Sequence, residues 1–316
     1  MIKRTLYFGN PSYLSLNNRQ LIVRLPEVEK NDTLTESFRQ QSAASIPIED
    51  IGVLILDNRQ ITLTHALLSA LLDNNTAVIT SDETHLPNGL FLPLAGNSVQ
   101  TEKFKHQIEA SVPLKKQLWQ QTVAAKINNQ AAILQNQNLP HQNMIHWAQS
   151  VKSGDADNHE ARASAHYWET LSSVFYKNQP GKTFRRHRNG EPPNNLLNYG
   201  YAILRAIIAR ALVSSGLLPT LGIFHRNKYN AYCLADDIME PYRPVVDKLV
   251  IQYVQSDAPV SELDLSAKKH LLSITTLDVL IENERSPLLI AISRTTASLA
   301  RCFEGTQRKI SYPSVA

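Results

Sequence analysis

The sequence has few cysteines and no long apolar run. Its 316 residues include two cysteines, Cys233 and Cys302, and no Cys-x-x-Cys pair, which excludes zinc ribbons and thioredoxin-like redox motifs. So few cysteines suit a reducing compartment, and we expect a cytoplasmic protein. The basic amino terminus lacks the apolar run of a signal peptide. No stretch of 18 apolar residues predicts a membrane span, because Arg205 and Arg210 interrupt the closest candidate, residues 201–213.

Charge is modest in amount and in balance. Charged residues make up 19% of the chain and apolar residues 43%, with a formal net charge of +4 and a pI near 8.9. These values are typical of a soluble globular protein and argue against wholesale disorder. The slight basic excess is compatible with a polyanionic partner but does not identify one. The length predicts about two domains.

The amino-terminal part predicts a β-rich domain. Short apolar or alternating runs separated by turn residues indicate a meander or sandwich. The run at 52–56 is typical of a strand buried on both faces, and it begins a β-α-β unit. The expected strands are 5–8, 13–16, 20–25, 52–56 and 76–80, with a helix over 64–74. We therefore predict a domain over residues 1–84, followed by a Pro- and Gly-containing linker over residues 85–97.

The remainder, residues 98–316, predicts an all-α domain. Long helical periodicity replaces alternation, and proline is sparse except at Glu240-Pro241-Tyr242-Arg243-Pro244, where a helix should kink or restart. The fold class is therefore α+β, with a small β-rich domain and a larger helical one. The expected helices are 99–137, 140–152, 158–177, 194–215, 228–256, 262–282 and 284–304.

Glu160 is the first candidate site residue. Asp157 or Asn158 is a plausible N-cap, which places Glu160 in the first turn of a helix. The helix dipole alone explains a glutamate there. However, Glu160 shares a helix face with Tyr167 and Leu171. A carboxylate on such a semi-buried face needs a partner, and a metal ion is one such partner.

A second group of candidates follows 65 positions later. His225 comes after an apolar run, where a lone histidine is ordinarily a hydrogen-bonded core residue. Asp236, Asp237 and Glu240 follow at helical spacing, so their like charges destabilise a bare helix unless something offsets them. Arg243 offers an ion pair, and a divalent cation offers a stronger offset. Two carboxylates and an imidazole suit Mg²⁺ or Mn²⁺, and ligand type alone does not exclude zinc.

Positive charge lies close to both groups in the sequence. We name residues 182–188 the basic loop; with Arg226 and Lys228 beside His225, they predict contacts to a phosphate backbone. A solvated surface is the simpler alternative. A carboxylate-bound metal with a basic rim suits phosphodiester chemistry. The predicted DNA-binding residues are Lys182, Arg185, Arg186, Arg188, Arg226 and Lys228.

The order of these motifs resembles the Cas1 family of CRISPR-associated endonucleases, the integrase subunit of spacer acquisition, over essentially the whole chain. Each motif alone is weak, and the ordered set is specific. Ala161 stands where many relatives have glycine, which leaves Glu160 in place. Among members of this family, the sequence looks most like those that accompany type II CRISPR systems. The motifs are Asn158-His159-Glu160-Ala161 with Tyr167-Trp168, Asn195 to Tyr201, Gly222-Ile223-Phe224-His225, and Leu234 to Pro244.

The resemblance implies a site and its partners. It implies that the helical domain is catalytic and that Glu160, His225 and Glu240 bind the metal and carry catalysis, with Asp237 behind them. It also implies that the β-rich domain supports dimerisation. Two homodimers would flank a dimer of the small protein Cas2 in a heterohexamer. The substrates would be double-stranded DNA, as a spacer precursor and as the CRISPR repeat.

The expected reaction is attack by a 3′-hydroxyl of a short duplex on a repeat phosphodiester, or by water in a nuclease reaction. Two other readings remain open. A hydrolase of a small phosphoester needs the same three ligands without a long basic surface. A helical DNA-binding scaffold needs the carboxylates only for ion pairs. The sequence assigns no role to Cys233, which we expect to be a small buried core residue.

Overall fold

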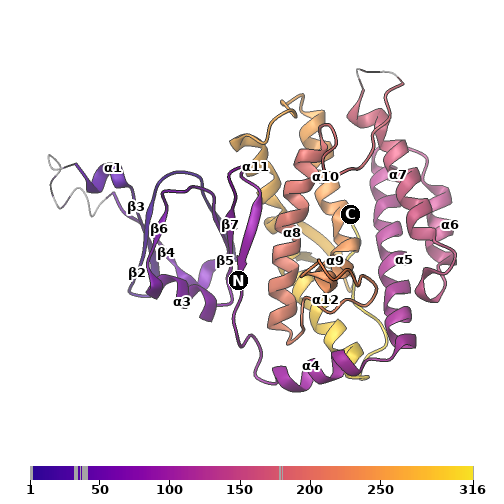
Figure 1. Ribbon diagram of the computed structural model, residues 1–316. Coiled ribbons are helices and arrows are strands. Elements are labelled where there is room, and N and C mark those ends of the chain that lie inside the picture. Colours follow the sequence, from indigo (N-terminus) through magenta and orange to yellow (C-terminus); the bar gives the residue numbers. More distant parts are fainter. Residues whose placement is uncertain are drawn as a thin grey trace. The chain divides into compact units, whose positions relative to one another are not determined.

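The computed structural model describes residues 3–31, 35, 37, 42–177, 179 and 181–315. The chain divides into two compact units, Met1–Gly96 and Asn97–Ala316, which differ in secondary structure (Figure 1). The first is built from two sheets and the second mainly from helices.

The first unit contains two four-stranded sheets. In one, β1, β5 and β7 are parallel and β8 is an antiparallel edge strand, in the order β1-β5-β7-β8; the other has the order β4-β3-β2-β6. The expected meander is present as antiparallel β2, β3 and β4. The bounds are β1 Arg4–Phe8, β2 Tyr13–Asn17, β3 Gln20–Arg24, β4 Ala44–Pro47, β5 Ile51–Leu56, β6 Thr62–Leu63, β7 Ala77–Ser81 and β8 Pro87–Phe91, with α1 Pro26–Glu29, 3-10 helix η1 Ile48–Asp50 and α3 His65–Asp73.

The predicted β-α-β unit is confirmed as β5, α3 and β7. Thr64 caps α3 by accepting a hydrogen bond from the Leu67 amide at 3.4 Å. Residues Ile51 to Ile55 of β5 are buried on both faces, as the continuous apolar run indicates. Leu67 and Leu71 of α3 pack with Leu54 in the core.

The predicted linker, residues 85–97, is wrong in part, because β8 lies within it. Pro87 and Gly89 are turn-forming residues, but β8 is an edge strand, where a proline does not interrupt the sheet. Gly89 also allows the close approach of β7, since a Cβ there would lie 2.2 Å from Thr80 Oγ1. The division between the compact units follows Gly96.

The second unit is organised around α8 and α5. α8 packs against α9, α10, α11 and α12, while α5 packs against α6, α7 and α10. α8 is also long and apolar enough to cross a membrane, but 78% of its most apolar window is buried in the unit. The bounds are α4 Gln100–Glu109, α5 Val112–Asn136, α6 Gln142–Ser150, η2 Ser153–Asp155, α7 His159–Phe175, α8 Asn194–Ser214, α9 Cys233–Met239, η3 Glu240–Tyr242, α10 Arg243–Gln255, α11 Leu265–Leu272, η4 Ser273–Thr276 and α12 Leu288–Phe303.

The prediction that this unit is all-α is wrong at one hairpin. β9 (Asp278–Ile281) and β10 (Glu284–Pro287) pair antiparallel, in a region expected to end one helix and begin another. The alternation of exposed and buried residues along β9 has a period of two. Glu282 and Asn283, with φ of 52° and 66°, form the two-residue turn, whose backbone matches the twist of a hairpin.

One predicted helix is interrupted, and one predicted interruption is present. The helix predicted over 99–137 is two helices, because Ser111 caps α5 by accepting a hydrogen bond from the Leu114 amide and Pro113 occupies its first turn. The predicted restart near Pro241 is confirmed as η3, between α9 and α10.

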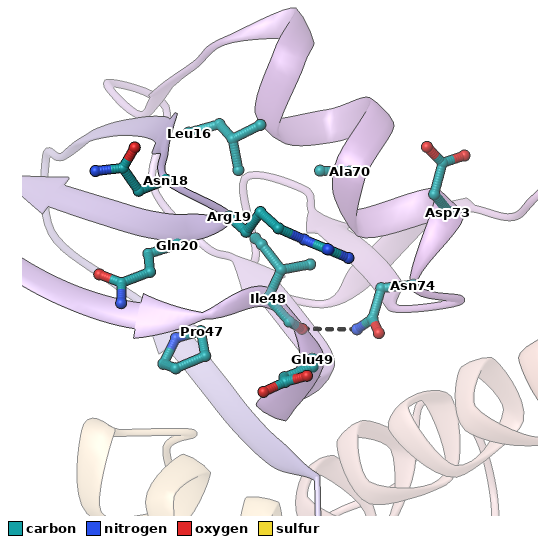
Figure 2. A pocket seen from close by; sticks show the side chains of 10 residues that line it. All are labelled: Leu16, Asn18, Arg19, Gln20, Pro47, Ile48, Glu49, Ala70, Asp73 and Asn74. Atoms are coloured by element: carbon teal, nitrogen blue, oxygen red, sulfur yellow. Dashed lines mark hydrogen bonds between the residues drawn. The ribbon is translucent and has the colours of Figure 1, made fainter.

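A pocket of about 660 Å³ lies in the first unit (Figure 2). Asn74 forms part of its wall and donates from Nδ2 to the Ile48 carbonyl at 2.7 Å. Arg19, Glu49 and Asp73 supply its charges. The pocket contains none of the predicted site residues, so we assign it no chemistry.

Candidate metal and DNA site

The amino-terminal end of α7 positions Glu160. Asn158 is the N-cap residue but makes no side-chain cap hydrogen bond. Asp155 caps the helix instead, accepting from the amides of His159 at 2.9 Å and Glu160 at 3.0 Å. The expected N-cap role of Asp157 or Asn158 is therefore carried by a residue further upstream. As expected, Tyr167 on the same face is buried.

A buried lysine on α5 connects two of the predicted ligands. Lys126 Nζ forms an ion pair with Glu160 Oε1 and lies 2.6 Å from Glu240 Oε2. Its side chain is 7% exposed. Burial lowers the pKa of Lys126, but the charges of Glu240 and Glu160 outweigh burial and hold that pKa above its ordinary value. We call Glu160 and Glu240 the acidic pair, because both carboxylates meet one ammonium.

Glu240 is the more buried member of the acidic pair. Its Oε1 lies 3.0 Å from Arg243 Nε, which is the ion pair considered from the sequence. Burial alone would raise the pKa of Glu240. The charges of Arg243 and Lys126 together lower that pKa by more than burial raises it, so it lies below its usual range. Glu240 Oε2 meets the Lys126 ammonium at 2.6 Å, and a carboxylate oxygen has a second lone pair. This buried oxygen therefore retains coordinating capacity.

His225 lies in the loop before α9 and is held by Asp237. His225 Nδ1 is 2.5 Å from Asp237 Oδ1, and Asp237 also accepts from the amides of Phe224 at 2.9 Å and His225 at 3.2 Å. The hydrogen bond from Asp237 raises the pKa of His225, burial opposes it, and the charge of Glu240 adds to the increase. The engagement of Nδ1 leaves Nε2 as the ring nitrogen suited to a cation.

The three carboxylates near α9 pair with different side chains. Asp236 pairs with Arg205, whose Nε lies 2.6 Å from Oδ1, and with Asn230. Asp237 faces His225, and Glu240 faces Lys126 and Arg243. Each charge has its own partner, so the repulsion is offset locally.

Of the predicted ligands, Glu160 and Glu240 meet at Lys126, and His225 lies within electrostatic reach of Glu240. Within the described part of the chain, no group of three or more His, Cys, Asp and Glu side chains is arranged to hold a metal ion. The Lys126 ammonium instead forms ion pairs with both glutamates. The sequence analysis did not identify Lys126. Its spacing from Trp119, Val123 and Gln130, which are buried on α5, indicates a lysine on the buried face of the helix, where a charge needs a partner.

An open cleft of about 760 Å³ connects Glu160 with the basic loop. Its walls come from α7 and from residues 183–186. Arg185 and Arg186 line the cleft, but Arg186 also donates to Asn194 and Asn198, at 2.9 and 2.7 Å. Lys182 pairs with Glu191 at 2.7 Å. The other predicted DNA-binding residues are exposed: Arg185, Arg188, Arg226 and Lys228. The predicted DNA-binding residues therefore differ in whether their charge is already engaged by a partner within the chain.

We expect the replacement Asp237→Asn to lower the pKa of His225. The native pKa lies above the ordinary value of 6.5, so this group stabilises the fold fully below 6.5, and that contribution is lost as pH rises through the folded-state pKa. The variant should lose this pH dependence. Titration of the His225 ring by NMR in a chelating buffer measures it, and an unchanged pKa in the variant would contradict the assignment.

We expect Gly222→Ala to disturb the support of His225. A Cβ at this position would lie 2.4 Å from the His225 carbonyl oxygen and 2.7 Å from Asp237 Oδ2, and neither atom belongs to a flexible chain end. Overpacking of this kind costs roughly 1–3 kcal/mol of unfolding free energy. Chemical denaturation measures the loss, and a variant as stable as the wild type would show that the loop adjusts freely.

Comparisons with known proteins identify the family of the chain. Residues 8–275 match the family described as CRISPR associated protein Cas1. A CRISPR-associated endonuclease Cas1 from Neisseria meningitidis is 37% identical over 94% of this chain and 91% of its own length. The fold is similar to that of a casposase bound to integration product (TM-score 0.77, 21% identity, 98% of this chain and 92% of that one) and to a Cas6-RT-Cas1–Cas2 complex (TM-score 0.70, 19% identity, 98% and 36%). The chain belongs to the Cas1 family.

Proposed function

We propose that the protein is a metal-dependent DNA integrase and endonuclease, which inserts short duplexes into a CRISPR array. One observation carries the proposal beyond family membership: the acidic pair, from α7 and η3, shares the buried Lys126 ammonium, and Glu240 acts electrostatically on His225. A scaffold gains little from a shared buried ammonium of this kind, because buried ion pairs contribute weakly to stability. A site built to hold a cation requires such convergence.

The donor set fits a hard divalent cation. Glu160, Glu240 and His225 would hold it, with carboxylate oxygens and an imidazole nitrogen of the kind that Mg²⁺ and Mn²⁺ accept. The buried Glu240 Oε2, which already meets a cationic group, and the imidazole oriented by Asp237 support this fit. When bound, the ion would favour ionisation of the attacking hydroxyl and offset charge on the phosphate.

Other residues of the site hold the predicted ligands in position and offer a path for the DNA. Asp237 holds the His225 ring through Nδ1, and Arg243 fixes one oxygen of Glu240. The cleft beside Glu160 leads to Arg185 and offers a path for a phosphate backbone. With a 3′-hydroxyl as nucleophile, its oxygen gives its proton to solvent and bonds to the target phosphorus, while the bond from that phosphorus to a 3′ oxygen of the repeat breaks and the departing oxygen takes up a proton. With water as nucleophile the same geometry gives a nick.

Partners and subtype are proposed from the family. The Cas2-containing complex among the structural neighbours and the DNA-bound casposase support partners of those kinds. We propose a homodimer, two of which assemble with a Cas2 dimer on duplex DNA in the cytoplasm. The type II assignment remains a prediction from the motifs.

The reaction type is tested by comparing two duplexes that differ in one atom. A labelled duplex ending in a 3′-hydroxyl should join to repeat DNA in the presence of Mn²⁺ and Cas2, and its 3′-deoxy counterpart should not. A requirement for the hydroxyl supports transesterification. Joining of both duplexes, or cleavage of a small phosphoester without DNA binding, would contradict it.

A further inference from the structure

We propose that Trp119 and Phe224 form a stacking subsite for the terminal nucleobase of the attacking strand. The inference rests on the proposed function and adds a binding element to it. The two rings are parallel, with centroids 4.2 Å apart and an interplanar angle of 1°. Trp119 is 3% exposed and Phe224 is 48% exposed. The stack therefore begins in the core and ends at the surface.

The stacking subsite lies directly beside a predicted metal ligand. The Phe224 ring centroid is 5.4 Å from that of His225, at 84°, and the Trp119 centroid is 5.7 Å from His225, at 83°. The imidazole thus stands nearly perpendicular to both stacked rings. A flat group added to the outer face of Phe224 would lie next to the nitrogen donor of the site.

Phe224 is fixed in place before any ligand arrives. Its amide donates to Asp237 Oδ2 at 2.9 Å, and that carboxylate is fully buried. The same carboxylate holds the His225 ring. Because one buried group positions both residues, the aromatic face and the imidazole keep a constant separation, as a preorganised subsite requires.

The surroundings favour a nucleobase over an apolar protein side chain. Arg226 and Lys228 follow in the same loop and are exposed, and Lys228 Nζ lies 4.8 Å from the Tyr229 ring centroid. Aromatic faces flanked by cationic side chains are the combination that binds unpaired nucleotides. A base inside a duplex has both faces covered by its neighbours. The terminal base at the reacting 3′ end offers a free face.

The subsite is tested with 2-aminopurine, whose fluorescence is quenched by stacking. The probe is placed at the 3′ end of one duplex and ten positions inside another, and each is bound to the full chain in Ca²⁺. We expect stronger quenching at the 3′ end for the wild type and for Phe224→Trp. Phe224→Ala and Phe224→Leu should lose the difference, and Phe224→Ala should bind this duplex about tenfold more weakly.

Leu221→Ala is the matched control, since Leu221 is a 44% exposed apolar residue of the same loop, and it should behave as the wild type. Fluorescence anisotropy reports total DNA binding separately, and circular dichroism confirms folding. If the variants bind DNA and retain 3′-end quenching, the subsite is wrong while the proposed function stands. Stronger quenching at the internal probe overturns the assignment to the terminal base. If the wild-type protein does not bind either duplex, both the subsite and the proposed function are wrong.

Discussion

Glu160→Gln should reduce strand transfer by about a hundredfold or more, because loss of a ligand removes several kcal/mol of charge stabilisation in the transition state. The substitution keeps the size of the side chain and removes one of the two charges that meet at Lys126. The rate of joining of a labelled duplex to repeat DNA at saturating Mn²⁺ measures the effect.

Glu169→Gln is the control for this prediction. Glu169 lies on the same helix, is exposed and lines the same cleft as Glu160, but it has no place in the acidic pair. It should retain strand transfer near the wild-type rate. Equal rates for Glu160→Gln and the wild type would remove Glu160 from the site.

Lys126→Met should destabilise the protein in a chelating buffer and make its stability strongly dependent on Mn²⁺. Removal of the ammonium leaves Arg243 and His225 as cationic groups that act on Glu240. Breaking a buried ion pair costs roughly 3–5 kcal/mol, and we expect Tm to fall by about 10 °C. A divalent cation replaces the lost charge, so Mn²⁺ should raise the Tm of the variant more than that of the wild type.

Lys105→Met, on the exposed surface of α4, controls for the loss of a positive charge. It should leave Tm and its response to Mn²⁺ unchanged. If Lys126→Met also leaves both unchanged, the internal ammonium does not share the acidic pair with the metal, and the proposed competition is wrong.

The sequence predicted the local elements well where one periodicity dominated. The run at 52–56 identified a buried strand, and the Glu240-Pro241 pair identified a helix restart, because both signals are local. The β9–β10 hairpin was missed because four-residue strands are too short to separate from helical periodicity. Asp155 was missed as a cap because a left-handed turn through Gly154 and Asp155 returns its carboxylate to α7.

The site was predictable in its residue types and not in its contacts. The separation of Glu160, His225 and Glu240 in sequence gives no distance between them, and the motifs supplied the grouping. Lys126 carries no motif, so its contact with both glutamates depends on how α5 packs against α7 and η3. Packing likewise decides that Lys182 and Arg186 have partners within the chain while Arg185 is exposed.

The central claim is that two glutamates and one imidazole bind a common cation. A crystal soaked in Mn²⁺ and measured at the manganese absorption edge tests it directly. We predict one anomalous peak contacted by Glu160, Glu240 and His225 Nε2, with Lys126 moved away from the acidic pair. Absence of a peak there, with Lys126 still joining the two carboxylates at saturating Mn²⁺, would contradict it.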